Sequence, residues 1–76
     1  MNAQRRKRLA KVEELLSEAG SLLEEIVSEE REALDNMPDS IRESDRGEEM
    51  EEKLSYLEDC FSSLEDSTSS LSEVLG

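Results

Sequence analysis

A seven-residue pattern of apolar and polar positions runs through the second half of the chain. Met50, Leu57, Leu64 and Leu71 each open a unit, and a second position of the stripe follows four residues later. Spacing that alternates between four and three residues is typical of a coiled-coil helix, whose single apolar stripe needs other helices to cover it. We therefore predict a helix over about 46–75. Its predicted contact positions are Met50, Leu54, Leu57, Phe61, Leu64, Leu71 and Leu75, with Thr68 as a polar member.

The first half of the chain carries the same period with less regularity. Its stripe advances in steps of three and four residues, which predicts a helix over about 3–36. The predicted contact positions are Leu9, Val12, Leu16, Ala19, Leu23, Ile26, Ala33 and Met37, with Glu30 as the charged member. Leu15, Leu22, Val27 and Leu34 widen this stripe, so the helix has a face broad enough for more than one neighbouring helix.

A turn over about 37–45 separates the two predicted helices. Pro38 ends the first helix, because proline disfavours the helical conformation of the preceding residue and has no amide hydrogen to donate. Asp45 and Glu48 have the spacing of a capping box, which indicates that the second helix begins near Asp45.

The predicted fold is all-α, an antiparallel two-helix hairpin that forms a single domain over residues 1–76. If Met37 faces Met50, the two stripes pair in a fixed register. In that register Ala33 faces Leu54, Glu30 faces Leu57, Ile26 faces Phe61, and Ala19 faces Thr68 beside Gly20. The flanking apolar residues remain uncovered, so we expect a homo-oligomer, either a dimeric four-helix bundle or a higher helical oligomer.

Charge is distributed unevenly along this chain of formal net charge -12. Arg5, Arg6, Lys7 and Arg8 lie together near the start, and the remaining length is strongly acidic, which disfavours direct nucleic-acid binding. Three interpretations of the basic cluster stay open: it neutralises the negative end of the second helix, it binds an anion through contact with phosphates or nucleic acid, or it binds an acidic protein patch. No apolar run is long enough to span a membrane, so we expect a soluble and unprocessed protein. The lone Cys60 offers no disulfide within the chain, which fits a reducing compartment such as the cytoplasm.

Catalysis is not expected from this composition. The chain has no histidine, and the lone Cys60 has no imidazole to activate it, so we predict no enzyme activity, no metal site and no cofactor. Glu48, Glu49 and Glu52 match half of a magnesium-binding pattern of all-helical nucleotide pyrophosphohydrolases, but the Glu-x-x-Asp pair that should follow is missing.

Pairs of acidic residues follow three of the four apolar residues that open the units of the second helix. We expect them to point outward and to form a candidate partner-binding face. This acidic face consists of Glu51, Glu52, Glu58, Asp59, Glu65 and Asp66.

The stretch ALDNMPDSIRESDRGE at 33–48, with the basic start RRKRL and the acidic repeat, resembles small uncharacterised acidic proteins encoded by bacteriophages and prophages. The resemblance implies a bacterial cytoplasm, no catalytic residues, and a module that binds a bacterial protein to inhibit or modulate it. Two alternatives stay open. The chain is a nucleic-acid mimic that occupies a basic cleft, or it is a structural oligomer or a sponge for an anionic ligand.

Overall fold

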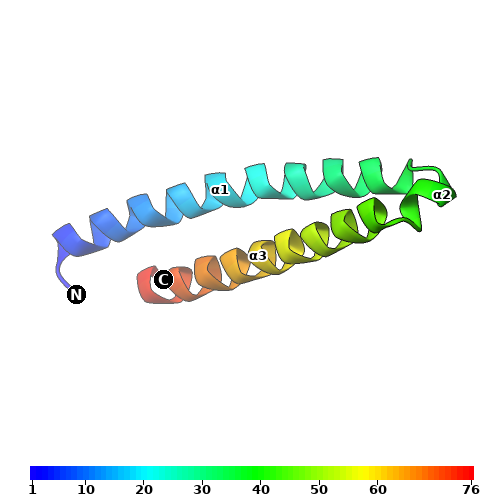
Figure 1. The fold of residues 1–76 in the computed structure, drawn as a ribbon. Coiled ribbons are helices and arrows are strands. Elements are labelled where there is room, and N and C mark those ends of the chain that lie inside the picture. The colour runs from blue at the N-terminus through cyan, green and yellow to red at the C-terminus, as the bar shows by residue number, and fades with distance from the viewer.

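The computed structural model describes residues 1–76 and is all-helical, which confirms the predicted fold class at that level. The helices are α1 (Ala3–Asp35), α2 (Asp39–Arg42) and α3 (Asp45–Leu75). α1 and α3 lie side by side and run in opposite directions, and α2 lies in the connection between them (Figure 1). The Cα atoms fill a rod of 58 × 14 × 14 Å. None of these helices combines the length and the apolar content that crossing a membrane requires.

The ends of α1 follow from local hydrogen bonding. The side chain of Asn2 caps the first turn, because its Oδ1 accepts a hydrogen bond of 2.8 Å from the amide of Arg5. At the other end Pro38 stops the helix, as predicted, and starts the next one. Its carbonyl accepts hydrogen bonds from the amides of Ile41 and Arg42, at 3.0 and 2.9 Å. The predicted turn over 37–45 therefore contains a short helix, α2, that the sequence pattern did not reveal.

The start of α3 differs from the predicted capping box. Ser44 is the N-cap residue, and its hydroxyl donates to the carbonyl of Ile41 instead of capping the new helix. Asp45 is the first helical residue, so it does not act as the cap. Asp45 and Glu48 in the first turn still place negative charge at the positive end of the helix dipole.

The face of α1 that packs on α3 differs from the predicted stripe. Every second predicted position is replaced by the residue that follows it in the sequence. The predicted residues Val12, Ala19, Ile26 and Ala33 are exposed, and so is Glu30. The buried or half-buried residues define what we call the inner face of α1: Leu9, Glu13, Leu16, Gly20, Leu23, Val27 and Leu34. Met37, just after the helix, is half-buried as well.

The difference arises because two possible heptad spacings have every second position in common. Leu9, Leu16 and Leu23 fit both a three-then-four and a four-then-three spacing. The stronger hydrophobicity of Val12 and Ile26 favoured the first spacing in the sequence. The structure follows the second, which is also the spacing of α3, so matched stripes meet along both helices.

The stripe of α3 lies against α1 along its whole length. Its predicted positions are half-buried, except that Leu54 is fully buried. Thr68 fits within this stripe because its hydroxyl donates to the carbonyl of Leu64 at 2.9 Å, which leaves no unpaired polar group. Gly20 faces Leu64 rather than Thr68, since a Cβ on Gly20 would lie 3.1 Å from the Leu64 Cδ2. The glycine thus brings the two helices close together at this level.

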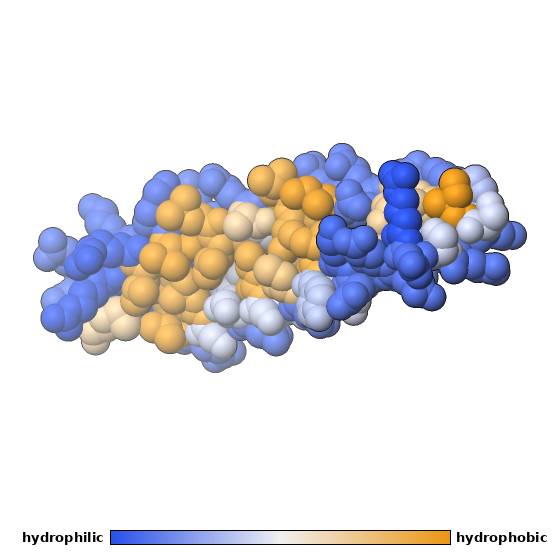
Figure 2. Space-filling view, viewed as in Figure 1, coloured by the Kyte–Doolittle hydropathy of each residue, from blue (hydrophilic) through white to orange (hydrophobic).

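Few side chains are removed from water. Leu34 and Leu54, with exposed fractions of 4% and 5%, are the only buried hydrophobic residues. Large apolar side chains remain exposed on α1, among them Val12, Leu15, Leu22 and Ile26. Figure 2 shows the result as a broad apolar band that extends over both helices on one face of the rod.

Candidate interaction surfaces

The acidic face of α3 forms two adjacent rows of carboxylates. Residues seven apart lie on nearly the same side of a helix, so Glu51, Glu58 and Glu65 form one row. The second row consists of Glu52, Asp59 and Asp66. Five of these six residues are exposed, and Glu58 is half-buried. The rows are therefore available to a partner along about half of α3, from Glu51 to Asp66.

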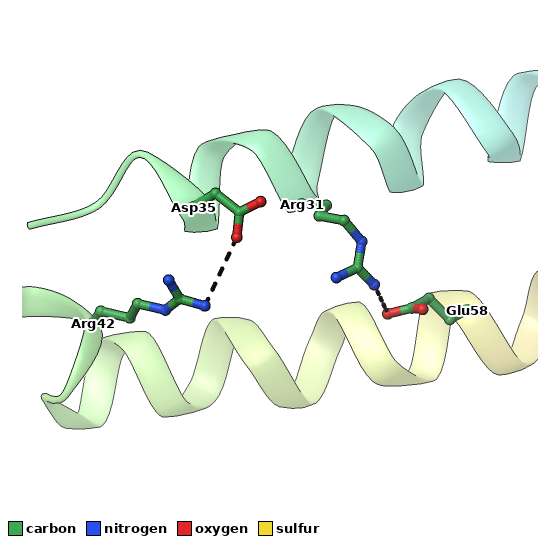
Figure 3. Close-up of polar contacts among 4 residues, drawn as sticks. All are labelled: Arg31, Asp35, Arg42 and Glu58. Carbon is green, nitrogen blue, oxygen red and sulfur yellow. Dashed lines mark hydrogen bonds and ion pairs between the residues drawn. The ribbon is translucent and has the colours of Figure 1, made fainter. Parts of the chain in front are cut away.

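Glu58 departs from the expectation that the whole acidic face points outward. Its Oε1 lies 2.7 Å from Nη2 of Arg31 on α1, and the two side chains keep exposed fractions of 43% and 52% (Figure 3). Arg31, not the neighbouring Glu30, therefore faces α3 at this level, which corrects the predicted pairing of Glu30 with Leu57. Arg31 was missed in the sequence because the stripe of α1 was assigned from the spacing of apolar residues, which does not identify charged contacts with α3.

The basic cluster lies where α1 extends past the end of α3 (Figure 1). Arg6 donates through Nη2 to the carbonyl of Leu75 at 2.5 Å, so one member of the cluster caps the negative end of α3. Arg5, Lys7 and Arg8 are exposed. Arg5 and Arg8, with Met1, Leu9 and Val12, line an open depression of about 370 Å³.

The connection between the helices is organised around a buried glycine. A Cβ on Gly47 would overlap the carbonyl oxygen of Arg42 and lie 2.6 Å from its Cα, so only glycine fits the backbone contact of α2 with α3. Arg42 also reaches back to α1, with Nη2 at 3.7 Å from Oδ1 of Asp35 (Figure 3). The sequence signal for this contact was a glycine in the first turn of a predicted helix.

The side chains that could hold a metal ion do not gather at one place. No three Cys, Asp or Glu side chains come together in a way that would hold a metal ion. Cys60 is exposed, and Glu48, Glu49 and Glu52, which match half of the magnesium-binding pattern, lie exposed on the first turns of α3. Comparisons with protein-family models, curated proteins and solved structures find no match.

Proposed function

We propose that this protein is a phage-type interaction module: a helical hairpin that assembles as a dimeric four-helix bundle and binds a bacterial protein through the acidic face of α3. The partner carries a basic surface, and binding inhibits or modulates it in the bacterial cytoplasm. The observation that carries the proposal is the double row of exposed carboxylates, held on one rigid helix in a chain of net charge -12.

The rigidity of the surface supports a role in recognition. α3 is one continuous helix from Asp45 to Leu75, so its carboxylates keep fixed spacings before a partner arrives. A preorganised charged surface speeds encounter with a partner of opposite charge and suppresses wrong partners.

Self-association is supported by the small amount of apolar surface that one chain covers. With two buried hydrophobic residues, a single pair of helices has little core to stabilise it. A second chain provides the additional helices that the exposed apolar band needs.

Nucleic-acid mimicry is the second candidate, because the rod is 58 Å long and acidic along one side. The two rows supply two carboxylates for every seven residues, or roughly every 10 Å of helix. A nucleic-acid strand carries a phosphate about every 3.4 Å. The sparser charge of α3 favours recognition of a discrete basic patch over replacement of a long phosphate backbone.

The structural oligomer and the anionic-ligand sponge remain alternatives with less support. Arg6 is already engaged by the end of α3, which reduces the positive charge that an anionic ligand would meet.

Capture of partners from a bacterial lysate on the immobilised full chain tests the proposal. One variant neutralises the five exposed residues of the acidic face by the substitutions Glu51→Gln, Glu52→Gln, Asp59→Asn, Glu65→Gln and Asp66→Asn. Glu58 is kept, because its ion pair with Arg31 supports the helix contact. We expect the affinity for the captured protein to fall at least about tenfold, and wild-type binding to weaken steeply with salt.

A matched control removes the same number of charges from exposed sites on α1. It carries Glu14→Gln, Glu18→Gln, Glu24→Gln, Glu25→Gln and Glu32→Gln, all at exposed positions. Equal loss of binding in both variants would show that net charge matters and the acidic face does not. Salt-insensitive binding that survives the α3 substitutions would eliminate both the acidic-face mechanism and nucleic-acid mimicry.

A further inference from the structure

The exposed side of α1 carries a second coiled-coil stripe, which we call the outer seam: Val12, Leu15, Ala19, Leu22 and Ile26. The steps between its members alternate between three and four residues, and the same spacing continues to Arg8 before it and to Glu29 after it. All of these residues are exposed, with Leu15 at 51% and Leu22 at 59%.

The outer seam has the position that a bundle helix needs for a second neighbour. Each member of the outer seam directly precedes a residue of the inner face in the sequence. Because consecutive residues of an α-helix are about 100° apart around its axis, the two faces are separated by about 100°. In a four-helix bundle each helix contacts two neighbours on faces separated by roughly a right angle. α3 covers the first of these faces, and nothing in the single chain covers the second.

We propose that the outer seam binds a second copy of this chain in antiparallel orientation, with Ala19 of both copies beside a two-fold axis. The inference rests on the self-association in the proposed function, and it names the surface and the symmetry of that contact. In this register Val12 lies opposite Ile26 of the second copy, and Leu15 lies opposite its Leu22. Ala19 is small, so the two α1 helices can approach closely where they cross.

The amount of exposed surface fits a second copy. A compact chain of 8.6 kDa has an accessible surface of about 4,700 Å² by the usual scaling with mass. This chain exposes 5839 Å², an excess of about 1,100 Å². Stable interfaces bury about 800 Å² on each partner, so covering the outer seam and the adjoining apolar band accounts for an excess of this size.

Charge complementarity selects the antiparallel orientation. Arg8 and Glu29 are each three seam positions from Ala19, on opposite sides of it and 11 and 10 residues away, so the two-fold axis brings Arg8 beside Glu29 of the second copy, twice. The open depression beside Arg5 and Arg8 then receives the segment around Glu29 of the partner copy. A parallel arrangement would instead bring the arginines of both copies together at one end and both Glu29 carboxylates together at the other.

The same rotation brings α3 against α3 of the second copy and closes a four-helix bundle. The side of α3 that shares this face of the rod carries Cys60, Ser63, Ser67 and Val74, all exposed. In Figure 2 the apolar band of α1 continues over α3 beside paler, weakly polar residues. These small side chains permit close approach, while α1 supplies most of the apolar area.

Sedimentation of the full-length protein over a range of concentrations tests the surface. We expect the wild type to dimerise and Leu22→Glu to raise the dimer dissociation constant at least about 100-fold, since symmetry buries the new charge twice. Ser21→Glu is the matched control, because it adds the same charge at the neighbouring exposed position away from the seam. Circular dichroism checks that both variants stay helical.

The outcomes separate this inference from the proposed function. A wild type that sediments as a monomer at every concentration would remove the self-association of the proposed function as well. A dimer whose dissociation constant is the same with Leu22→Glu would leave self-association standing and overturn the outer seam as its surface.

Two further variants test the symmetry even if Leu22→Glu unfolds the chain. Ala19→Cys in a Cys60→Ser background should form a disulfide-linked dimer, because the two cysteines would approach within the roughly 7 Å between Cα atoms that a disulfide allows. Ser17→Cys in the same background points to the opposite side of α1 and should remain reduced. Crosslinking of both cysteines to the same extent would overturn the placement of Ala19.

Charge exchange tests the orientation. Arg8→Glu and Glu29→Arg should each raise the dissociation constant about tenfold, and the double variant should return it to within about threefold of the wild type. Failure of the double variant to recover, together with a tighter dimer for Glu29→Gln, would overturn the antiparallel arrangement in favour of a parallel one.

Discussion

The two ends of the rod differ in how completely one chain packs them. At the turn end, Leu34 and Leu54 are buried, Gly47 lies against the backbone of Arg42, and α2 closes the connection. At the open end, α1 extends past α3, and Leu71 and Leu75 remain half-buried. The turn end thus resembles a finished small core, and the open end resembles half of an interface.

The two ends also differ in the contacts that join α1 to α3. Arg31 and Glu58 lie one turn beyond Leu34 and Leu54 and border the buried pair at the turn end. At the open end the links between helices are polar and exposed: Ser72 donates to Glu13 at 2.8 Å, and Arg6 donates to the Leu75 carbonyl. The chain therefore fixes its register near the turn and leaves apolar side chains uncovered towards the termini.

A large loss of stability should come from Gly47→Ala. The added methyl group would overlap the Arg42 backbone, which cannot move aside as a flexible side chain can, so we expect a loss of about 2–3 kcal/mol in unfolding free energy. Urea denaturation at a fixed protein concentration measures it.

Gly20→Ala is the matched control for this substitution. Gly20 is also a buried helical glycine, but its nearest neighbour is the movable end of Leu64 at 3.1 Å. The gain of about 1 kcal/mol in helix propensity should offset the tight contact, so stability should stay constant or rise. Equal destabilisation by both substitutions would contradict the claim that the backbone contact at the turn sets Gly47 apart.

Truncation of one leucine at each end compares how much the packing at each end contributes to stability. Leu54→Ala should cost about 2–5 kcal/mol, because it opens a cavity in a buried site. Leu71→Ala removes a half-buried side chain and should cost less, about 1–2 kcal/mol.

The dependence on protein concentration distinguishes the two leucines further. If a second chain covers the open end, the cost of Leu71→Ala should grow as the dimer is populated, while that of Leu54→Ala should stay the same. Thermal unfolding at low and high protein concentration measures both. If the loss of stability caused by Leu71→Ala is the same at low and high protein concentration, the open end is not half of an interface.

Much of this fold was predictable from the sequence, and the reasons are local. The stripe of α3 was predictable because its heptads are regular, and the end of α1 was predictable because Pro38 acts on its own neighbours. The exposure of five acids on α3 followed from the same period.

The parts that the sequence did not predict depend on contacts between distant residues. Val27 and Leu34, not Ile26 and Ala33, lie on the inner face, where Gly20 packs beside Leu64. Hydrophobicity along the chain favoured the other spacing, because it contains no information on which spacing matches α3. The Arg31–Glu58 pair likewise forms only once the two long helices lie side by side.

The smallest expected effect concerns the ion pair that borders the turn-end core. Arg31 and Glu58 are about half exposed, so water screens their attraction, and a double-mutant cycle with Arg31→Gln and Glu58→Gln should give a coupling of about 0.5 kcal/mol. Salt at about 1 M shortens the screening length to about 3 Å and should abolish most of that coupling. Because both residues lie within one chain near the finished end, the coupling should not change with protein concentration. A coupling that appears only when the protein self-associates would mean that the pair belongs to the interface, and that the turn end is completed by a second chain as well.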